Sequence, residues 1–187
     1  SMKILLIAGG WSSEREVSLT GARGMQEALL KRGHAVTFFD LLENFDELLE
    51  TARQHDFALI NLHGSPGEDG LVQAMLEKAG CPYQGSGPSG SFLALNKAAA
   101  KQIFRMAGLP TADWEFLPVR PAEGWEPRLP WPLFVKTTTG GSSLRLGRAT
   151  NRQELDALMD EIFAAGEGVL IEPQLPGKEI TCGILGE

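Results

Sequence analysis

The sequence has only two cysteines among its 187 residues, Cys81 and Cys182. Two thiols without metal-like spacing exclude a disulfide framework, and their apolar neighbours predict buried, unreactive side chains. No hydrophobic run is long enough to span a bilayer, and no signal peptide follows Met2. Cations are scarce too: 17 Lys and Arg face 24 Asp and Glu, which argues against binding to a nucleic-acid backbone. We therefore expect a cytoplasmic protein with neither a membrane nor a nucleic-acid partner.

The first part of the chain alternates apolar strands with helices. Residues 3–8, 35–39 and 57–62 predict strands, and the helices expected between and after them include a short one over residues 46–54. Such alternation is typical of an α/β fold with a doubly wound parallel sheet, whose ligands bind beyond the carboxyl ends of the strands. Glycine-rich loops follow residues 8 and 62, so we expect a ligand site at that edge.

The pattern changes to an α+β arrangement after about residue 88. The expected elements are a helix over 91–107, strands over 112–117, 132–136, 144–149, 168–172 and 179–185, a proline-rich loop over 118–131, and a helix that Asn151 caps. We divide the chain into a domain over residues 1–87 and a second over 88–187. A strand this near residue 187 would leave an open sheet edge, so we expect the chain to be cut from a longer one.

A lysine at the end of a predicted strand precedes a loop of small residues. Lys136 ends the apolar strand, and Thr137-Thr138-Thr139-Gly140-Gly141-Ser142-Ser143 follows. Small side chains and many backbone N–H groups suit closure over an anion, with Lys136 as a point charge beneath. The alternative is a surface hairpin with an exposed tip, and this stretch alone does not decide between them.

Two side chains near the expected sheet edge have both a functional and a structural interpretation. Glu16 could hold a substrate ammonium, but Ser13-x-x-Glu16 also matches a helix capping box, and spacing alone favours the cap. His63 could orient a substrate carboxylate, or it could bond the loop backbone. Its position after a buried strand leaves these two interpretations equally open.

Four further charged side chains are ambiguous on the same grounds. Lys97 and Lys101 belong to an expected helix, where a lysine usually faces solvent. Glu172 and Glu179 flank a Pro/Gly hinge and could bond an amine and two sugar hydroxyls. As solvent-facing strand ends they would have no such function, and that interpretation has the higher prior.

A series of short motifs runs along the chain in order. The motifs are Gly9-Gly10, Ser13-Glu14-Arg15-Glu16-Val17-Ser18-Leu19, His63-Gly64, Gly67-Glu68-Asp69-Gly70, Gln73, Pro82-Tyr83, Gly85-Ser86-Gly87, Lys97, Gly108-Leu109-Pro110, Phe134-Val135-Lys136, Gly141-Ser142-Ser143, Glu172-Pro173, Gly177 and Glu179-Ile180-Thr181. Taken together, these motifs resemble the D-alanine–D-alanine ligase family of the ATP-grasp superfamily. The resemblance covers essentially the whole chain in register, and the combination is specific although each piece is weak.

The resemblance implies a pre-ATP-grasp domain followed by the first half of an ATP-grasp domain. ATP would phosphorylate one D-alanine, and the amine of a second would attack the acyl phosphate. The resemblance implies that Glu16 and Ser142 form a catalytic pair and that Glu16 and His63 bind the first D-alanine. It implies that the nucleotide phosphates are bound by Lys97, Lys136, Ser143 and the Gly140-Gly141 backbone. Glu172 and Leu175 would meet the adenine, and Glu179 would meet the ribose. A mobile Gly/Ser loop would keep water from the acyl phosphate.

The chain departs from the family pattern at several places. Thr137 stands where Pro is usual, Gly140 where an acidic residue is frequent, Asn96 where Asp precedes the lysine, and Leu144-Arg145 where small residues follow. By the resemblance, the Mg²⁺ ligands lie beyond Glu187, so no metal ligand is expected in this chain.

Because the second half of the grasp is missing, we expect activity from the full-length enzyme and not from this chain. Family members are commonly homodimers through the first domain, and the apolar helices here permit that. Two alternatives stay open. One is a ligase that uses D-lactate or D-serine as second substrate, and the other is a non-catalytic module that binds nucleotide or D-alanine.

Overall fold

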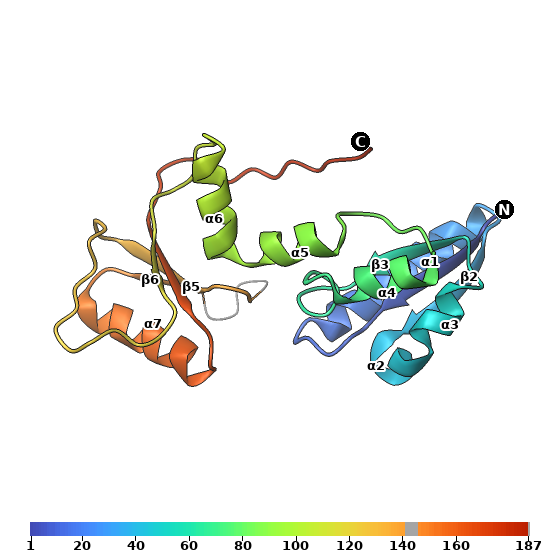
Figure 1. Cartoon of the computed structure of the whole chain (residues 1–187), viewed down its shortest axis with the longest axis horizontal. Helices are drawn as coiled ribbons and strands as arrows, with labels where there is room; N and C mark the ends of the chain where they lie inside the picture. Colours follow the sequence, from blue (N-terminus) through green and yellow to red (C-terminus); the bar gives the residue numbers. More distant parts are fainter. Residues whose placement is uncertain (141–145, 187) are drawn as a thin grey trace. The chain divides into compact units, whose positions relative to one another are not determined.

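The computed structural model describes residues 1–140 and 146–186, and its contacts divide them into two compact units. The first unit holds residues 1–103 with Thr139 and Gly140, and the second holds residues 104–138 and 146–186 (Figure 1). The boundary expected from the sequence, between residues 87 and 88, stays a prediction. In the described residues, no helix has the length and apolar character needed to cross a membrane.

The first unit contains a three-stranded parallel sheet in the order β2-β1-β3. Its elements are β1 (Lys3–Ala8), α1 (Arg15–Lys31), β2 (Ala35–Asp40), α2 (Leu41–Asn44), the 3₁₀ turn η1 (Phe45–Glu47), α3 (Leu48–Ala52), β3 (Phe57–Asn61) and α4 (Leu71–Ala79). The predicted α/β fold is confirmed. The helix predicted over residues 46–54 is interrupted, because η1 precedes α3.

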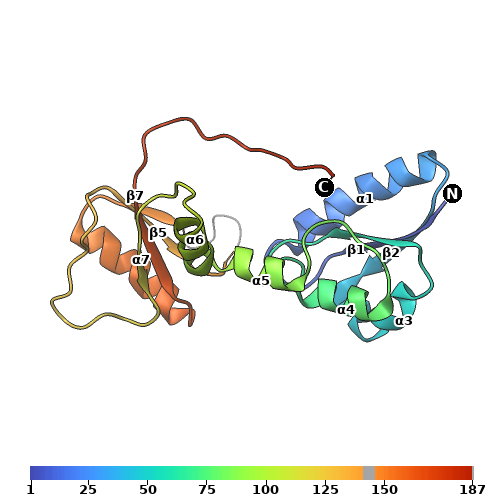
Figure 2. The ribbon, with the colours of Figure 1, turned by 45° about the horizontal axis from the view of Figure 1, so that its top comes forward.

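Strand β1 is apolar on both faces because helices cover both. Leu5 and Ile7 pack into the cluster that includes residues of α3 and α4, whereas Leu6 and Ala8 pack with Ala22 of α1. Figure 2 shows α1 on one side of the sheet and α3 and α4 on the other. Each fully buried Leu or Ile contributes about 1.5–3 kcal/mol to folding, so β1 anchors the loop that follows it.

The single helix predicted over residues 91–107 is wrong. The chain forms α5 (Pro88–Leu95) and α6 (Lys97–Met106), separated by Asn96 in an extended conformation (φ −78°, ψ 97°). The Asn96 Oδ1 accepts a hydrogen bond from the Ala99 N–H at 3.0 Å and so caps α6. A short polar side chain that competes with the backbone is the reason for the break.

The second unit is an antiparallel sheet in the order β4-β7-β5-β6, packed on one helix. Its elements are β4 (Glu115–Leu117), β5 (Leu133–Thr137), β6 (Gly147–Ala149), α7 (Arg152–Ala164) and β7 (Val169–Pro173). The expected hairpin of β5 and β6 and the α+β arrangement are confirmed. Asn151 caps α7 as predicted, since its side chain accepts from the Glu154 N–H.

The two faces of this sheet have different roles. Leu133 and Val135 of β5 pack with Leu155 and Ile162 of α7 in the core. Side chains alternate across a strand, so the intervening residues of β5 point to the face that α7 does not cover. That face, opposite α7, carries the second group of candidate site residues.

The strand predicted over residues 179–185 is wrong. Residues 174–186 form no helix or strand, and Ile180 and Ile184 are 89% and 90% exposed. Within the described residues this segment has no strand to pair with, and backbone groups without a partner strand stay solvated. Cys182 lies in the same segment and is exposed, contrary to the prediction of burial, while Cys81 is buried as predicted.

The proline-rich loop forms no helix or strand, as predicted, but it is fastened to the sheet by Glu115. One carboxylate oxygen of this buried side chain accepts from the backbone N–H groups of Arg128 (2.8 Å) and Leu129 (3.3 Å). The Arg128 guanidinium donates to the other oxygen at 3.2 Å. The loop is therefore held by a fully bonded buried carboxylate.

Candidate functional site

The loops that follow β1 and β3 lie against each other at the carboxyl edge of the parallel sheet. These strands are neighbours. A Cβ placed on Gly64 would lie 3.6 Å from the Ser12 Cβ, and one on Gly10 would lie 3.4 Å from the Leu62 Cδ2. The loop leading to Glu16 and the loop that starts at His63 are thus brought together, as expected for a sheet of this class.

Glu16 lies in the first turn of α1 and does not cap the helix. The N-cap residue is Glu14, and its side chain makes no capping hydrogen bond. Ser12, not Ser13, serves the turn, because its hydroxyl accepts from the Glu14 N–H at 3.2 Å. The capping-box interpretation is therefore wrong. The Glu16 carboxylate is exposed and makes no hydrogen bond within residues 1–140 and 146–186.

His63 is half-buried at the start of the loop after β3 and, among the described residues, bonds no loop backbone group. Acidic side chains brace that loop instead. Glu68 accepts from the Gly64 N–H at 2.8 Å, while Asp69 accepts from the Leu71 N–H at 3.1 Å and from the Ser65 hydroxyl. The two carboxylates that precede α4 are thus engaged in shaping the loop.

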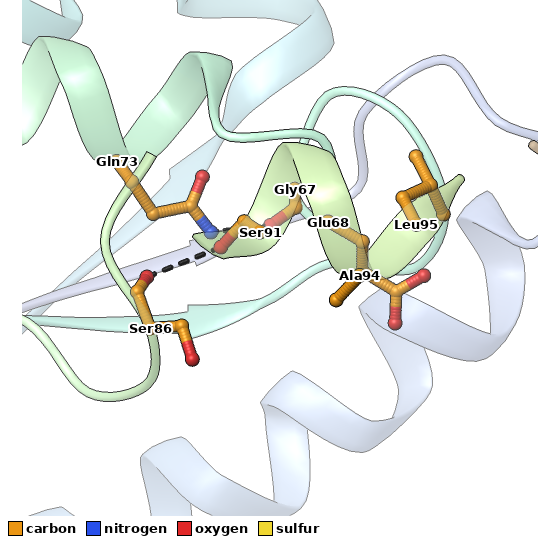
Figure 3. A pocket seen from close by; sticks show the side chains of 7 residues that line it. All are labelled: Gly67, Glu68, Gln73, Ser86, Ser91, Ala94 and Leu95. Atoms are coloured by element: carbon orange, nitrogen blue, oxygen red, sulfur yellow. Dashed lines mark hydrogen bonds between the residues drawn. The ribbon is translucent and has the colours of Figure 1, made fainter. Parts of the chain in front are cut away.

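A pocket of about 380 Å³ lies beneath this loop, beside α5 (Figure 3). Gln73 lines it and is buried, and its amide nitrogen donates to the Gly67 carbonyl at 2.6 Å. On the opposite side the Ser91 hydroxyl donates to the Ser86 carbonyl at 3.1 Å (Figure 3). Neither Glu16 nor His63 lines this pocket.

Lys97 is not a solvated helical lysine. It is the first residue of α6, and its Nζ donates to the Gly140 carbonyl at 2.5 Å. Lys101, one turn on, is 7% exposed, so the surface expectation is wrong for both. A cation at a helix N-terminus adds to the partial positive charge of the free N–H groups, and this combination attracts anions.

Lys136 and Glu172 form an ion pair on the face of the second sheet opposite α7. Phe134 is directly opposite Glu172 in the register of β5 and β7, so Lys136 is its diagonal neighbour on the same face. The side chains of the pair are only 27% and 13% exposed. Solvent-facing strand ends would be far more exposed, so that interpretation is wrong for Glu172.

The pair opens onto a pocket of about 470 Å³ on the same face of the sheet. Leu175, which is 63% exposed, and Glu179 line it as well. Further lining residues that the sequence analysis did not single out as site residues are Ala112, Phe134, Leu146, Pro173, Pro176, Gly177 and Lys178. One of these residues, Phe134, could have been found from the sequence, because it lies two positions before Lys136 in a predicted strand and therefore on the same face.

Part of the predicted site lies outside the described residues, namely Ser142 and Ser143 with Gly141 and Leu144-Arg145. Across residues 1–140 and 146–186, no three His, Cys, Asp or Glu side chains gather in a way that could hold a metal ion.

Comparison with known proteins extends these observations. Residues 102–187 match the family model described as "D-ala D-ala ligase C-terminus". The D-alanine–D-alanine ligase of Desulfovibrio desulfuricans is 76% identical over 186 residues, and that of Nitratidesulfovibrio vulgaris (Hildenborough) is 62% identical. Each alignment covers 100% of this chain and 61% of the relative.

Solved structures are similar along nearly the whole chain. The crystal structure of D-alanine–D-alanine ligase from Bacillus anthracis matches with a TM-score of 0.83 at 36% identity, over 95% of this chain and 59% of that one. The same enzyme complexed with ATP matches with a TM-score of 0.83 at 35% identity, over 95% and 60% of the two chains.

The parallel sheet, followed by an antiparallel sheet with its charged pocket, is thus a fragment of the ATP-grasp fold. Within that class, the whole chain is similar to D-alanine–D-alanine ligases, and its second half matches their family model. It spans about 61% of the length of the curated relatives that it matches.

Proposed function

We propose that the full-length protein joins two D-alanine molecules at the expense of ATP. The proposal is carried by the Lys136–Glu172 pair, a cation and a carboxylate on one sheet face at a pocket of about 470 Å³. Further support comes from relatives up to 76% identical that are named D-alanine–D-alanine ligase, and from the likeness to an ATP complex.

In this proposal the second unit receives the nucleotide. Lys136 exchanges its carboxylate partner for phosphate oxygens, while Glu172 and the backbone near Leu175 meet the adenine and Glu179 meets the ribose hydroxyls. The pocket suits such a ligand because apolar walls bury a base while a few polar groups orient it. Lys97 adds a second cation for the phosphates. Ser142 and Ser143 are proposed to add hydroxyl groups that bond them.

The first unit receives the first D-alanine. The Glu16 carboxylate bonds its ammonium group, and His63 bonds its carboxylate. An exposed carboxylate and a half-buried imidazole on adjoining loops offer a zwitterion one partner for each charge. Ser142 is proposed to bond Glu16 and so to hold that carboxylate in place during the reaction.

The chemistry proceeds in two displacements. A carboxylate oxygen of the first D-alanine attacks the γ-phosphorus of ATP, and the bond from that phosphorus to ADP breaks. The amine of the second D-alanine then attacks the acyl carbon, a C–N bond forms, and phosphate leaves. Phosphoryl transfer depends on positioning and charge neutralisation, which the two lysines supply.

Magnesium belongs to the proposal only as a requirement of the full-length protein. Within the described residues, no three His, Cys, Asp or Glu side chains gather in a way that could hold it. A cytoplasmic location and a homodimer formed through the first domain follow from the family resemblance alone.

The test is a product assay with the full-length protein, ATP and Mg²⁺. D-alanine alone should yield D-alanyl-D-alanine, with one phosphate released per dipeptide. Parallel reactions that contain D-lactate or D-serine with D-alanine measure the second-substrate preference. A protein that released no phosphate with D-alanine, or that formed product only with D-lactate or D-serine, would contradict the proposal.

A further inference from the structure

The first turn of α1 is fastened to two strand ends by Arg15. Its guanidinium donates to both carboxylate oxygens of Asp40, at the end of β2, at 2.7 and 2.5 Å, and also to the Gly10 carbonyl at 3.2 Å. The pair lies flush against the turn after β1. Gly9 there has φ +79°, and a Cβ on it would lie 2.5 Å from the Arg15 Nη1. Only glycine fits that place without displacing the pair.

One turn further on, Ser18 fastens the same helix to β1 and β3. The fully buried hydroxyl accepts from the Gly9 N–H at 2.8 Å and donates to the Asn61 carbonyl. In return, the Asn61 side-chain amide donates to the Ser18 carbonyl at 2.7 Å. The hydroxyl thus acts both as donor and as acceptor, and the reciprocal bond fixes the register of α1 on β3.

Glu16 lies between these two anchor points in the sequence, and His63 lies two residues after Asn61. Neither Glu16 nor His63 is held by its own side chain within the described part of the chain. Their positions relative to each other must therefore come from the backbones that carry them. The Ser18–Asn61 pair is the direct bonded link between those backbones.

We propose that Ser18 and Asn61 are positioning residues that set the distance between Glu16 and His63, with the Arg15–Asp40 pair as a second anchor. This inference rests on the proposed function, in which Glu16 and His63 hold the two ends of the first D-alanine. It adds residues that touch no substrate. Their effect is expected on the binding of D-alanine and not on that of ATP.

The physical reason is the loss of the whole link when one oxygen is removed. Ser18→Ala removes the hydroxyl that bonds the buried Gly9 N–H and the Asn61 carbonyl. A buried polar group that has lost its hydrogen-bond partner is costly, so the surrounding backbone tends to move until the group regains a bond. A shift of about 1 Å in a positioning element can cost on the order of 100-fold in rate. The N-terminal turn of α1 would then be free to move relative to β3.

The experiment compares steady-state constants of full-length wild type, Ser18→Ala and Asn61→Asp. Asn61→Asp keeps the side-chain volume but replaces the donated hydrogen bond by a carboxylate facing the Ser18 carbonyl. We expect each variant to raise the KM of the first D-alanine about 10-fold or more, with the KM of ATP within about 2-fold of wild type. Thr20→Ala, an exposed position on the same helix, is the matched control and should change neither constant.

The outcomes separate this inference from the proposed function. A wild type that makes no dipeptide removes the proposed function and this inference with it. An active wild type whose variants keep the wild-type KM for D-alanine overturns the positioning role alone. A rise in both KM values, in proportion to a lowered melting temperature, would also overturn it, because that is the pattern of general destabilisation. If Ser18→Ala does not fold, the KM of D-alanine in Asn61→Asp decides whether the positioning role holds.

Discussion

Each unit contains one pair of candidate site residues, and the two pairs are held in opposite ways. In the first, Glu16 and His63 make no hydrogen bond within the described chain, and the surrounding backbone is firmly tied. In the second, Lys136 and Glu172 are bonded to each other. The first arrangement suits a small zwitterion that supplies both missing partners. The second keeps a partly buried cation neutralised until a ligand takes over.

This difference has an energetic meaning. A partly buried ion pair is costly to break by removing one partner, because the remaining charge stays desolvated. In the proposed function, phosphates replace the carboxylate as the partner of Lys136, so nucleotide binding would exchange one charged contact for another. The proposed D-alanine would displace no protein partner of Glu16 among the described residues. The comparison therefore predicts large effects at Lys136 and smaller ones at Glu16.

The largest effect is expected from Lys136→Ala in the full-length protein. Removing a cation that neutralises developing phosphate charge should lower kcat/KM for ATP by about 100-fold to 1,000-fold. Steady-state kinetics with varied ATP measure this. Lys31→Ala, a 73% exposed lysine paired with Glu27 on α1, is the control and should leave kcat/KM unchanged. Equal kcat/KM values for Lys136→Ala and Lys31→Ala would contradict the proposed role of Lys136 in nucleotide binding.

Glu16→Gln should act on D-alanine instead. Losing one charge-assisted hydrogen bond is worth about 1.5–3 kcal/mol, so we expect the KM of the first D-alanine to rise by about 10-fold to 100-fold. The matched control is Glu27→Gln, at a 69% exposed carboxylate on the same helix. If Glu16→Gln bound D-alanine as tightly as wild type, its carboxylate would have no part in the site.

Asp40→Asn sharpens the comparison on the side of stability. The Arg15 guanidinium lowers the pKa of the Asp40 carboxyl in the folded state, through its hydrogen bond first and its charge second. The stabilisation is therefore present above the unfolded-state pKa, near 3.9, and is lost as pH falls through the folded-state value.

We expect Asp40→Asn to lower the free energy of unfolding by about 1–2 kcal/mol at pH 7. The difference from wild type should shrink as pH falls below about 4. Urea denaturation of both proteins at the two pH values measures it. The negative charges of Glu43 and Glu16 also raise the pKa of Arg15. Glu43→Gln therefore serves as a control for the general loss of a negative charge near this arginine. A difference that did not depend on pH would contradict the assignment.

The smallest effect is expected at the start of α7. Asn151→Ala removes an N-cap whose side chain accepts from the Glu154 N–H at 3.0 Å, and such caps are worth about 1 kcal/mol. Asn151→Ser should keep most of that stability. Thermal unfolding followed by circular dichroism compares the two. A loss as large in the serine variant would show that the cap is not the cause.

The sequence predicted best what depends on apolar periodicity and turn residues. The strands over residues 3–8 and 57–62 are found because buried apolar runs have a strong local cause, and α1 and α4 end beside the positive-φ glycines Gly33 and Gly80. The alternation along β5 would also have located Phe134 beside Lys136. These features need no knowledge of distant parts of the chain.

The errors arose where two local causes compete or where a partner decides. Ser13 and Glu16 have capping-box spacing, yet Ser12 makes the turn, because Arg15 and Ser18 tie the helix to the sheet. Asn96 ends one helix by capping the next. Residues 179–185 have the composition of a strand, but a strand requires a neighbour.

The contact between Ser18 and Asn61 could not be predicted, since it joins residues 43 positions apart. The same holds for the Lys97 contact with Gly140 and the exposure of Glu16. Spacing suggests which residue types can do the chemistry, whereas tertiary contacts decide which of them are held and which are left unbonded.

The most direct test of the account is a crossed measurement on the full-length protein: the KM of D-alanine in Lys136→Ala and the KM of ATP in Glu16→Gln. The account predicts that each variant changes the constant of its own ligand and leaves the other within about 2-fold of wild type. If each variant weakened both ligands equally, the separation into a D-alanine site and a nucleotide site would be contradicted.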